Sequence, residues 1–355
     1  MSVGGPGALR RFVLPALFVI ALFLAVWVRR PGGDAESSVV RLSGPTMGTA
    51  YHVTAVIEAP GVDEAAIRTA VDEALGEVDD AMSTYKPGSA LSRFNRHAET
   101  APFAVPPALI EVVALAQQVS AESDGAFDVT VGPLVRAWGF GPDDPGAAPT
   151  VEVQDALRAR VGWRKLTVDA RGSTLSKSQP DVDLDLSAIA KGYGVDQAAT
   201  ALDRLGLTRY LVEVGGEVVT RGANPEGEPW RVGIEKPAYD GGGLQEVVAL
   251  SGRAMATSGD YRNYREVDGR RVSHTIDPRT GRPIEHRLAS VSVIATRCAV
   301  ADAWATALNV LGPEAGLALA RERDLAALMI VRTESGAFEE RATPAFEAFR
   351  IARPD

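Results

Sequence analysis

The feature that most constrains the fold is a series of short apolar and alternating segments in the second half of the chain. Parallel neighbouring strands need a crossover of about a dozen residues or more, usually a helix, whereas antiparallel neighbours can be joined by a tight turn. Several of these segments follow one another too closely for helical crossovers. We therefore expect an α+β domain whose mixed sheet is mainly antiparallel, with strands at 210–220, 230–235, 247–250, 272–276 and 288–295.

Helices are interspersed with these strands. One is indicated by apolar residues that recur at three- and four-residue steps along a single face: Ile67, Val71, Leu75, Val78 and Met82. Other helices are expected over 107–123, from 187, and from Cys298 and Pro313; further strands are expected at 163–168, 181–186 and 325–331. We assign residues 39–355 to one domain.

The first 38 residues have a different character. An uncharged apolar run from Phe12 to Val28 lies between two arginine pairs, and its 17 residues are at the lower limit for spanning a bilayer. We therefore expect residues 1–38 to form one transmembrane signal anchor and a polar linker. A cleaved signal peptide is the alternative, although no small-x-small cleavage site precedes the second arginine pair. The balanced arginines do not fix the orientation.

Charge and cysteine content exclude some classes of function. The net charge of −9 and the lack of any long basic run argue against a nucleic-acid partner, which needs clustered Lys and Arg. Cys298 is the only cysteine, so the chain forms neither an internal disulfide nor a thiolate metal cluster.

The stretch "SAIAKGYGVD", residues 187–196, follows the alternating run "DVDLDL" and raises the question of a phosphate-binding turn. A dinucleotide-binding fingerprint needs a third glycine where this chain has Gln197, and no G-x-x-x-x-G-K-[ST] motif occurs. On its own, the stretch is best explained as a helix whose small residues allow close packing on a neighbouring element.

The segment "RCAVADAWATALNV" contains a candidate metal site. Asp302 and Thr306 stand four residues apart and so share a helix face. A carboxylate and a hydroxyl are hard oxygen ligands of the kind that magnesium prefers. The alternative is that Asp302 merely interacts favourably with the helix dipole.

Two other residues are chemical candidates with ordinary alternatives. His274 lies in the strand-like run "VSHTIDPRTGRP" beside a tight turn, where it could act as an acid or base near neutral pH or be purely structural. Phe127 in "DGAFDVTVGPL" could stack on a planar ligand or belong to the core. In "EVGGEV", Gly215 and Gly216 suggest close approach of a backbone.

Taken in order, these stretches and several others resemble the ApbE family, flavin transferases that move FMN from FAD onto a threonine or serine of a protein. The resemblance covers roughly Val39 to Arg350 and implies an ApbE-like α+β fold. Unlike the lipoprotein members, this chain has no cysteine after its apolar segment. The stretches are "TMGT", "MSTYKPGSALSRFN", "GAFDVTVGPL", "DLDLSAIAKGYGVD", "VEVGGEV", "SGDY", "SHTIDPRTGRP" and "CAVADAWATAL".

The resemblance also implies the site residues. Magnesium would be held by the backbone carbonyl of Ala188 and the side chains of Asp302 and Thr306. His274 and Asp302 would be the catalytic residues. FAD would be contacted by Met47, Tyr85, Ala126, Phe127, Asp128, Asp185, Lys191 and His274.

The expected reaction is a Mg²⁺-dependent transfer of FMN from FAD to a threonine or serine hydroxyl of a target protein, with release of AMP. Either His274 or a nearby carboxylate would accept the proton of the hydroxyl. With water as acceptor the same site would be an FAD pyrophosphatase, and a carrier that binds FAD without chemistry is a third alternative. A carrier has no need of the Asp302 and Thr306 pair.

The resemblance further implies where the protein works and with which partners. The acceptor would be an extracytoplasmic or membrane protein, such as a subunit of a redox complex or an FMN-binding domain. With the anchor at 12–28, we expect localisation at the bacterial cytoplasmic (inner) membrane, with the catalytic domain on the periplasmic side.

Overall fold

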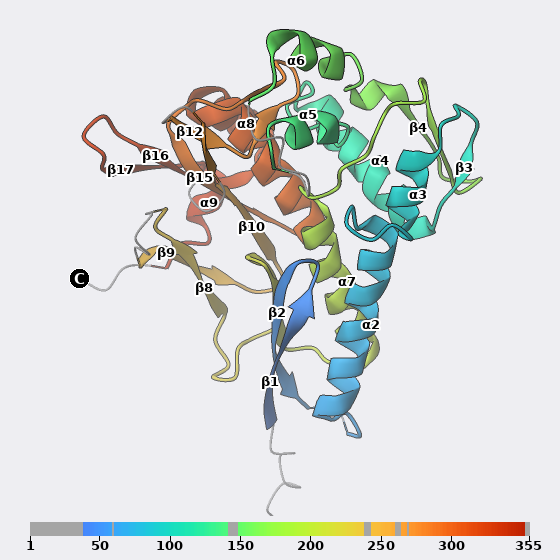
Figure 1. The fold of residues 1–355 in the computed structure, drawn as a ribbon. Helices are drawn as coiled ribbons and strands as arrows, with labels where there is room; N and C mark the ends of the chain where they lie inside the picture. The colour runs from blue at the N-terminus through green and yellow to red at the C-terminus, as the bar shows by residue number, and fades with distance from the viewer. Residues whose placement is uncertain are drawn as a thin grey trace, which may run out of the picture. The chain divides into compact units, whose positions relative to one another are not determined.

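The computed structural model describes residues 38–351, except 59, 141–147, 238–242, 260–263 and 268–269. The main sheet has the strand order β1-β2-β6-β7-β10-β15-β16-β17 (Figure 1). Each pairing for which a register is defined is antiparallel, which confirms the expected α+β class. The strands are β1 (Ser38–Thr46), β2 (Thr49–Ile57), β6 (Tyr210–Val214), β7 (Glu217–Arg221), β10 (Ala254–Gly259), β15 (Leu288–Ala295), β16 (Ala326–Arg332) and β17 (Phe338–Ala342).

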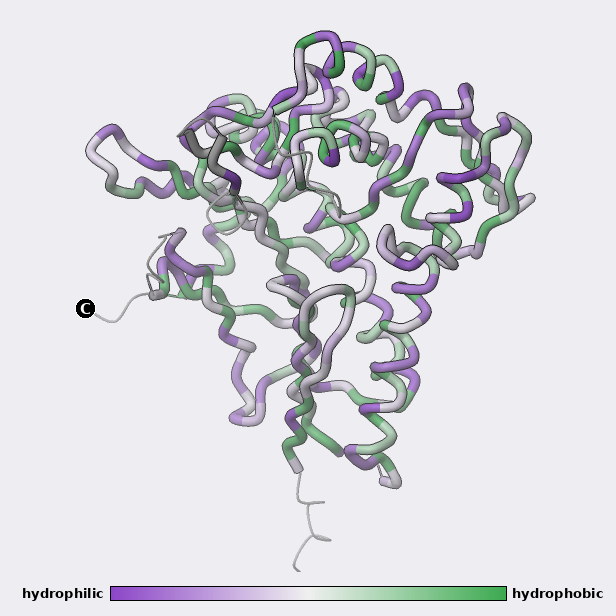
Figure 2. Tube along the Cα trace, in the orientation of Figure 1, coloured by the Kyte–Doolittle hydropathy of each residue, from purple (hydrophilic) through white to green (hydrophobic). Residues whose placement is uncertain are grey.

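Successive side chains of these central strands point to opposite faces of the sheet, and both faces are buried. In β16, Ala327 and Met329 pack in one hydrophobic cluster, whereas Leu328 and Ile330 pack in another. In β10, Met255 joins the second cluster while its neighbour Ala256 joins the first. Figure 2 shows hydrophobic residues recurring along these strands. Because successive side chains enter two different buried clusters, both sets must be apolar, and these strands are therefore nearly continuous apolar runs.

Helices cover one face of the sheet and a β-hairpin covers the other (Figure 1). The helical side is formed by α2 (Glu64–Met82), α7 (Ala190–Arg204) and α8 (Cys298–Glu322). The opposite side is formed by β8 (Trp230–Glu235), β9 (Leu244–Leu250) and α9 (Pro344–Glu347). The expected helix with apolar residues at 67, 71, 75, 78 and 82 is confirmed as α2, and those residues are its buried face.

A smaller group of elements packs beside the helices. A three-stranded sheet has the order β3-β5-β4, and α4 covers it. Two short two-stranded sheets, β11-β12 and β13-β14, complete the described strands. The elements are α3 (Ala90–Arg96), β3 (Phe103–Ala104), α4 (Pro107–Glu122), α5 (Gly132–Ala137), α6 (Val151–Arg158), η1 (Trp163–Lys165), β4 (Leu166–Asp169), β5 (Thr174–Lys177), β11 (Tyr264–Val267), β12 (Arg270–Ser273), β13 (Ile276–Asp277) and β14 (Arg282–Pro283).

The expected strand at 181–186 is wrong. Val182, Leu184 and Leu186 are buried with the expected alternation, but the segment pairs with no strand. A side chain takes the place of a partner strand, because Asn95 Nδ2 donates to the carbonyl of Leu184 and Asn95 Oδ1 accepts the N–H of Leu184, each at 2.8 Å. Alternating burial therefore indicated an extended backbone but not its hydrogen-bonding partner.

Other boundaries also differ from expectation. Residues 163–165 form η1 ahead of β4, and the strand expected at 210–220 is two strands, β6 and β7. The strand expected over 272–276 is interrupted, because β12 ends at 273 and β13 begins at 276, which leaves His274 between them. The helices expected from Cys298 and Pro313 are the two halves of α8, which is kinked at Gly312 (φ 78°). The helix expected from 187 begins at Ala190, after a turn.

The expected membrane anchor requires a correction. Among the residues that the structure describes, no helix is both long and apolar enough to cross a bilayer. The run at 12–28 lies outside the described residues. The supported fold class is an α+β domain with a large antiparallel sheet, and we withdraw the expected anchor together with the inner-membrane localisation that depended on it. The boundary between residues 38 and 39 stays a prediction.

The contact between α7 and α8 depends on a glycine, and this generates a first prediction. A Cβ on Gly192 would lie 2.5 Å from the backbone oxygen of Cys298 and 2.9 Å from the Cα of Ala299. We expect Gly192→Ala to destabilise the protein by about 1–3 kcal/mol, because neither backbone can yield without moving a helix.

Gly76 in α2 provides the matched control. It is also a helical glycine, but a Cβ there would meet nothing within 4 Å. Gly76→Ala should therefore stabilise the protein by about 0.5–1 kcal/mol. Thermal unfolding of both variants checks the pair, and equal melting temperatures would contradict the proposed close contact.

Candidate active site

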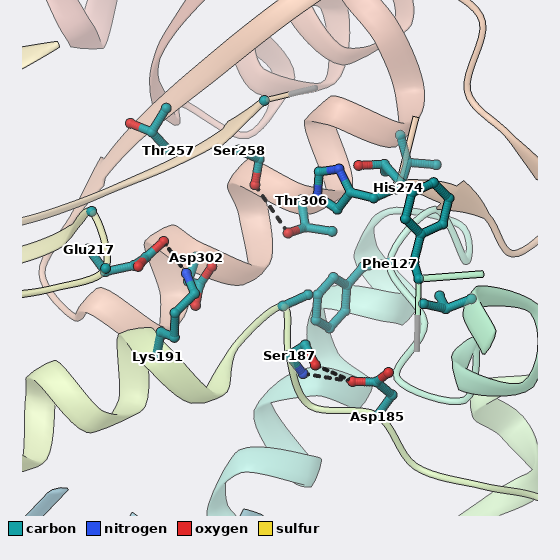
Figure 3. Close-up of a pocket in the computed structure, with 18 of the residues that line it drawn as sticks. Phe127, Asp185, Ser187, Lys191, Glu217, Thr257, Ser258, His274, Asp302 and Thr306 are labelled. Carbon is teal, nitrogen blue, oxygen red and sulfur yellow. Dashed lines mark hydrogen bonds and ion pairs between the residues drawn. The ribbon is translucent and has the colours of Figure 1, made fainter. Parts of the chain in front are cut away.

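A cavity of about 1170 Å³ opens beside α7, α8 and the ends of the central strands. Every residue predicted for the site except Met47 lines it: Tyr85, Ala126, Phe127, Asp128, Asp185, Ala188, Lys191, His274, Asp302 and Thr306. Figure 3 shows Lys191, Glu217 and Asp302 gathered on one side of the pocket and Thr306, Phe127 and His274 toward the other. Segments that are far apart in the sequence thus form one site.

The first half of α8 contributes the acidic end of the cavity. Asp302 is 4% exposed, and its Oδ2 accepts the N–H of Gly192 at 3.1 Å. One helical turn later, the hydroxyls of Thr306 and Ser258 lie 3.2 Å apart. Ala188 lies in the turn before α7 and lines the same cavity. Asp302, Thr306 and Ala188 therefore line one space.

The half-buried Lys191 ammonium contacts the buried carboxyl group of Glu217 beside Asp302. Lys191 Nζ lies 2.6 Å from Glu217 Oε1, and the Glu217 side chain is 3% exposed. Its other oxygen, Oε2, is buried and has no hydrogen-bond partner among the described residues. An orphaned buried carboxylate oxygen is costly, so this arrangement is not explained by stability.

Burial and charge shift the ionisation of all three groups. Burial, followed by the charge of Asp302, raises the pKa of Glu217 to about 8. Burial also raises the pKa of Asp302. Burial lowers the pKa of Lys191, but the charges of Asp302 and Glu217 outweigh it and hold that pKa above its usual value. The lysine therefore stays charged. Such shifts in a cavity are typical of functional sites.

The opposite wall of the cavity contains the ring of Phe127, and hydrogen bonds of the neighbouring Asp128 fix the backbone there. Phe127 is 2% exposed, so it forms the wall rather than protruding from it. Asp128 Oδ1 accepts the N–H and the hydroxyl of Thr130 at 2.8 and 2.6 Å, and its Oδ2 accepts the N–H of Trp163 at 2.8 Å. Asp128 thus fixes the backbone that carries Phe127.

Asp185 and Tyr85 lie at the accessible parts of the cavity. Asp185 Oδ1 accepts both the N–H and the hydroxyl of Ser187, at 2.9 and 2.6 Å, and this shapes the turn that leads to Ala188 and Lys191 (Figure 3). Tyr85 is 72% exposed, which makes its ring available to a ligand.

Met47 is the one predicted residue that does not line the cavity. It occupies the turn between β1 and β2 with a positive φ of 47°, and its sulfur lies near Gly194 of α7, 3.2 Å from where a Cβ would be. In this structure Met47 packs against the core; its contact with FAD stays a prediction.

His274 lies between β12 and β13 and points its ring toward the cavity wall formed by Phe140, with ring centroids 6.2 Å apart.

Sequence reasoning did not name several residues that line this cavity, among them Glu217 and Ser258. The glycines of "EVGGEV" predict only the close approach of a backbone and no role for its acidic residues. An acidic residue placed directly after a Gly-Gly turn, at the first position of a buried strand, is the signal that could have identified Glu217.

The oxygen-bearing groups at the acidic end of the cavity are compatible with a hard cation. Within the described part of the chain, no cluster of three or more His, Cys, Asp or Glu side chains could hold a metal ion. A site built from Asp302, Thr306 and the Ala188 carbonyl would have a single carboxylate. Oxygen donors of this kind suit Mg²⁺, which usually keeps several waters and uses one or two carboxylates together with substrate phosphates.

Comparison with known proteins agrees with the expected family. The profile of the ApbE family matches residues 47–329. A Vibrio cholerae protein named FAD:protein FMN transferase is 48% identical over 320 residues, which are 90% of this chain and 95% of that protein. An Escherichia coli K12 protein of the same name is 42% identical over 349 residues, covering 96% of this chain and 98% of that protein.

Solved structures resemble the fold as well. The flavin transferase ApbE from Vibrio cholerae aligns with a TM-score of 0.82 at 47% identity, covering 88% of this chain and 99% of that one. The apo form of the Pseudomonas stutzeri flavinyl transferase ApbE aligns with a TM-score of 0.82 at 43% identity, covering 88% and 97%.

The raised pKa of Glu217 generates a prediction for stability. In the folded state Glu217 keeps its proton between pH 4.5 and about 8, whereas the unfolded chain releases it near 4.5. The folded state then binds more protons than the unfolded state, so Glu217 lowers stability as pH rises through this window. Gln resembles the protonated acid in shape, can accept a hydrogen bond from Lys191 and does not titrate.

We therefore expect Glu217→Gln to be more stable than the wild type near pH 8, by on the order of 1–3 kcal/mol, and close to it near pH 4.5. Chemical denaturation at both pH values measures the difference. A stability difference that does not change with pH would contradict the raised pKa.

Proposed function

This chain belongs to the ApbE family, and we propose that its cavity transfers FMN from FAD to a threonine or serine hydroxyl of another protein with the help of a divalent cation, Mg²⁺. The chain is an FAD:protein FMN transferase, like the relatives that share its fold and nearly half of its residues. The cation and the type of acceptor residue are the proposal. The observation that carries it is the meeting of Asp302, Thr306 and Lys191 in one cavity.

The proposed cation ligands are the Asp302 carboxylate, the Thr306 hydroxyl and the Ala188 carbonyl. Asp302 Oδ2 already accepts the N–H of Gly192, which orients the carboxylate and leaves Oδ1 as a ligand. When bound, Mg²⁺ would neutralise charge on the diphosphate of FAD. The high pKa of Asp302 without a cation predicts that metal affinity rises with pH, because the ligand must lose its proton.

The remaining residues would bind and orient FAD. The Lys191 ammonium offsets phosphate charge, and its contact with Glu217 Oε1 holds it at the acidic end of the cavity. The apolar wall around Ala126 and Phe127 and the exposed ring of Tyr85 suit a planar flavin. Asp128 and Asp185 act through the backbone turns that they stabilise.

The proposed chemistry is an in-line displacement at the FMN phosphorus. The acceptor oxygen forms a bond to that phosphorus, the bond from phosphorus to the bridging oxygen breaks, and AMP leaves with the bridging oxygen. His274 accepts the hydroxyl proton, because an imidazole at the cavity can do so near neutral pH. The product is a phosphoester-linked FMN on the acceptor protein.

The first test removes the charge of the proposed metal ligand. Asp302→Asn keeps the shape and an oxygen that accepts the N–H of Gly192, so the fold should persist. We expect FMN transfer at ordinary Mg²⁺ concentration to fall by about a hundredfold or more, because the cation loses its only charged side-chain ligand. Mass analysis of the acceptor and AMP release measure the transfer.

Asp196→Asn is the matched control. Asp196 is a half-buried aspartate at the contact of α7 and α8, where it accepts the N–H groups of Cys298 and Ala299, but it does not line the cavity. Its variant should lose stability and keep its Mg²⁺ dependence. Full activity of Asp302→Asn would reject the metal assignment.

The second test concerns His274. We expect His274→Ala to lower the transfer rate by about a hundredfold or more, with FAD affinity little changed, if the imidazole is the base. Rates with a threonine-bearing acceptor, together with FAD binding measured by flavin fluorescence, separate the two effects. An unchanged rate with weaker FAD binding would make His274 a binding residue. Equal release of FMN and AMP with and without acceptor would favour the hydrolase.

A further inference from the structure

A buried asparagine of α8 connects the proposed metal-binding face of this helix to the segment that carries His274. Asn309 follows Asp302 and Thr306 by seven and three residues, so the three share one face of the helix. Asn309 is 1% exposed, and its Nδ2 donates to Thr275 Oγ1 at 3.2 Å. Thr275 directly follows His274.

The backbone carbonyl of Asn309 is held by a histidine side chain. In a regular helix its carbonyl would accept the N–H of residue 313, but Pro313 has none. His286 Nε2 lies 2.8 Å from that carbonyl, while the N–H of Leu288 donates to His286 Nδ1 at 3.3 Å. Nδ1 is therefore the acceptor, and Nε2 carries the hydrogen that it donates to Asn309. The kink at Gly312 admits this ring, since a Cβ there would lie 2.7 Å from His286 Cδ2.

Thr275 is fixed by its backbone as well as by its hydroxyl. Its N–H donates to Ser273 Oγ at 3.1 Å, and its carbonyl accepts the N–H of Ile284 at 3.1 Å. His274 itself lies outside both flanking strands. The bond from Asn309 thus links this segment directly to the helix that bears Asp302 and Thr306.

We propose that Asn309 is a positioning residue for FMN transfer, which holds His274 in register with the metal-binding face of α8 through the hydroxyl of Thr275. This inference rests on the proposed role of His274 as the base. A displacement of about 1 Å at a reacting group can lower a rate by about a hundredfold, so losing this link should affect catalysis more than binding.

The test uses variants at both ends of the link. Asn309→Leu keeps the volume and removes the donor, and Thr275→Val removes the acceptor hydroxyl with little change of shape. We expect each to lower kcat for FMN transfer by about 10- to 100-fold. The Kd for FAD, measured by flavin fluorescence without acceptor, should change less than about twofold. The double variant should be no worse than either single one, and Thr275→Ser, which keeps the hydroxyl, should retain the wild-type rate.

Thr343→Val is the control for a general loss of stability. Thr343 is 1% exposed, its hydroxyl accepts the N–H of Ala327 at 3.0 Å and donates to the Leu325 carbonyl at 2.7 Å, and it does not line the cavity. This variant should have a lower melting temperature and an unchanged transfer rate.

The His274→Ala background distinguishes a positioning role from a structural one. There, Asn309→Leu should cause no further loss of transfer. A further loss in that background, a wild-type kcat in both Asn309→Leu and Thr275→Val, or a loss confined to FAD affinity would overturn the inference while leaving the base role intact. A wild-type rate for His274→Ala itself would instead reject the base role and with it this inference.

Discussion

The reciprocal contact between α7 and α8 is the constraint on which the rest of the site depends. Asp196 of α7 accepts the first two N–H groups of α8, and Asp302 of α8 accepts the N–H of Gly192 in the first turn of α7. The first N–H groups of a helix have no partner within the helix, so each carboxylate satisfies donors that would otherwise be orphaned. Because the bonds run in both directions, they fix the distance between the two helix starts. Lys191 and Asp302 are thereby brought to the same end of the cavity.

The contact between α7 and α8 places charged side chains at buried positions where they do not stabilise the fold. Lys191, Glu217 and Asp302 are largely withdrawn from water, and one oxygen of Glu217 has no partner among the described residues. Burying such groups costs stability unless they are fully paired. The surrounding apolar clusters on both faces of the sheet offset this cost and hold the charged groups in place. A substrate carrying a diphosphate and a cation would supply the missing partners, which is the physical reason for regarding this end of the cavity as the reaction centre.

Several parts of the fold and site could be predicted locally. The apolar period of α2 appears directly in the sequence, and so does the short spacing of the strands that makes the sheet antiparallel. Asp302 and Thr306 could be paired because helical geometry places residues four apart on one face. The same local reasoning failed for 181–186, where Asn95 takes the place of a partner strand. It also missed Glu217, because its partner Lys191 is distant in the sequence.

The sequence by itself therefore determined most of the elements, the class of the sheet and, through its ordered motifs, the family. Only the tertiary structure decided which groups act on one another. Local periodicity reports which side of an element is buried, but the partner of a buried charge depends on how two elements pack. The raised pKa of Glu217, the exclusion of Met47 from the cavity lining and the link from Asn309 to the segment of His274 all arise from contacts between segments far apart in the chain. Such contacts exist only once the sheet has brought those segments together.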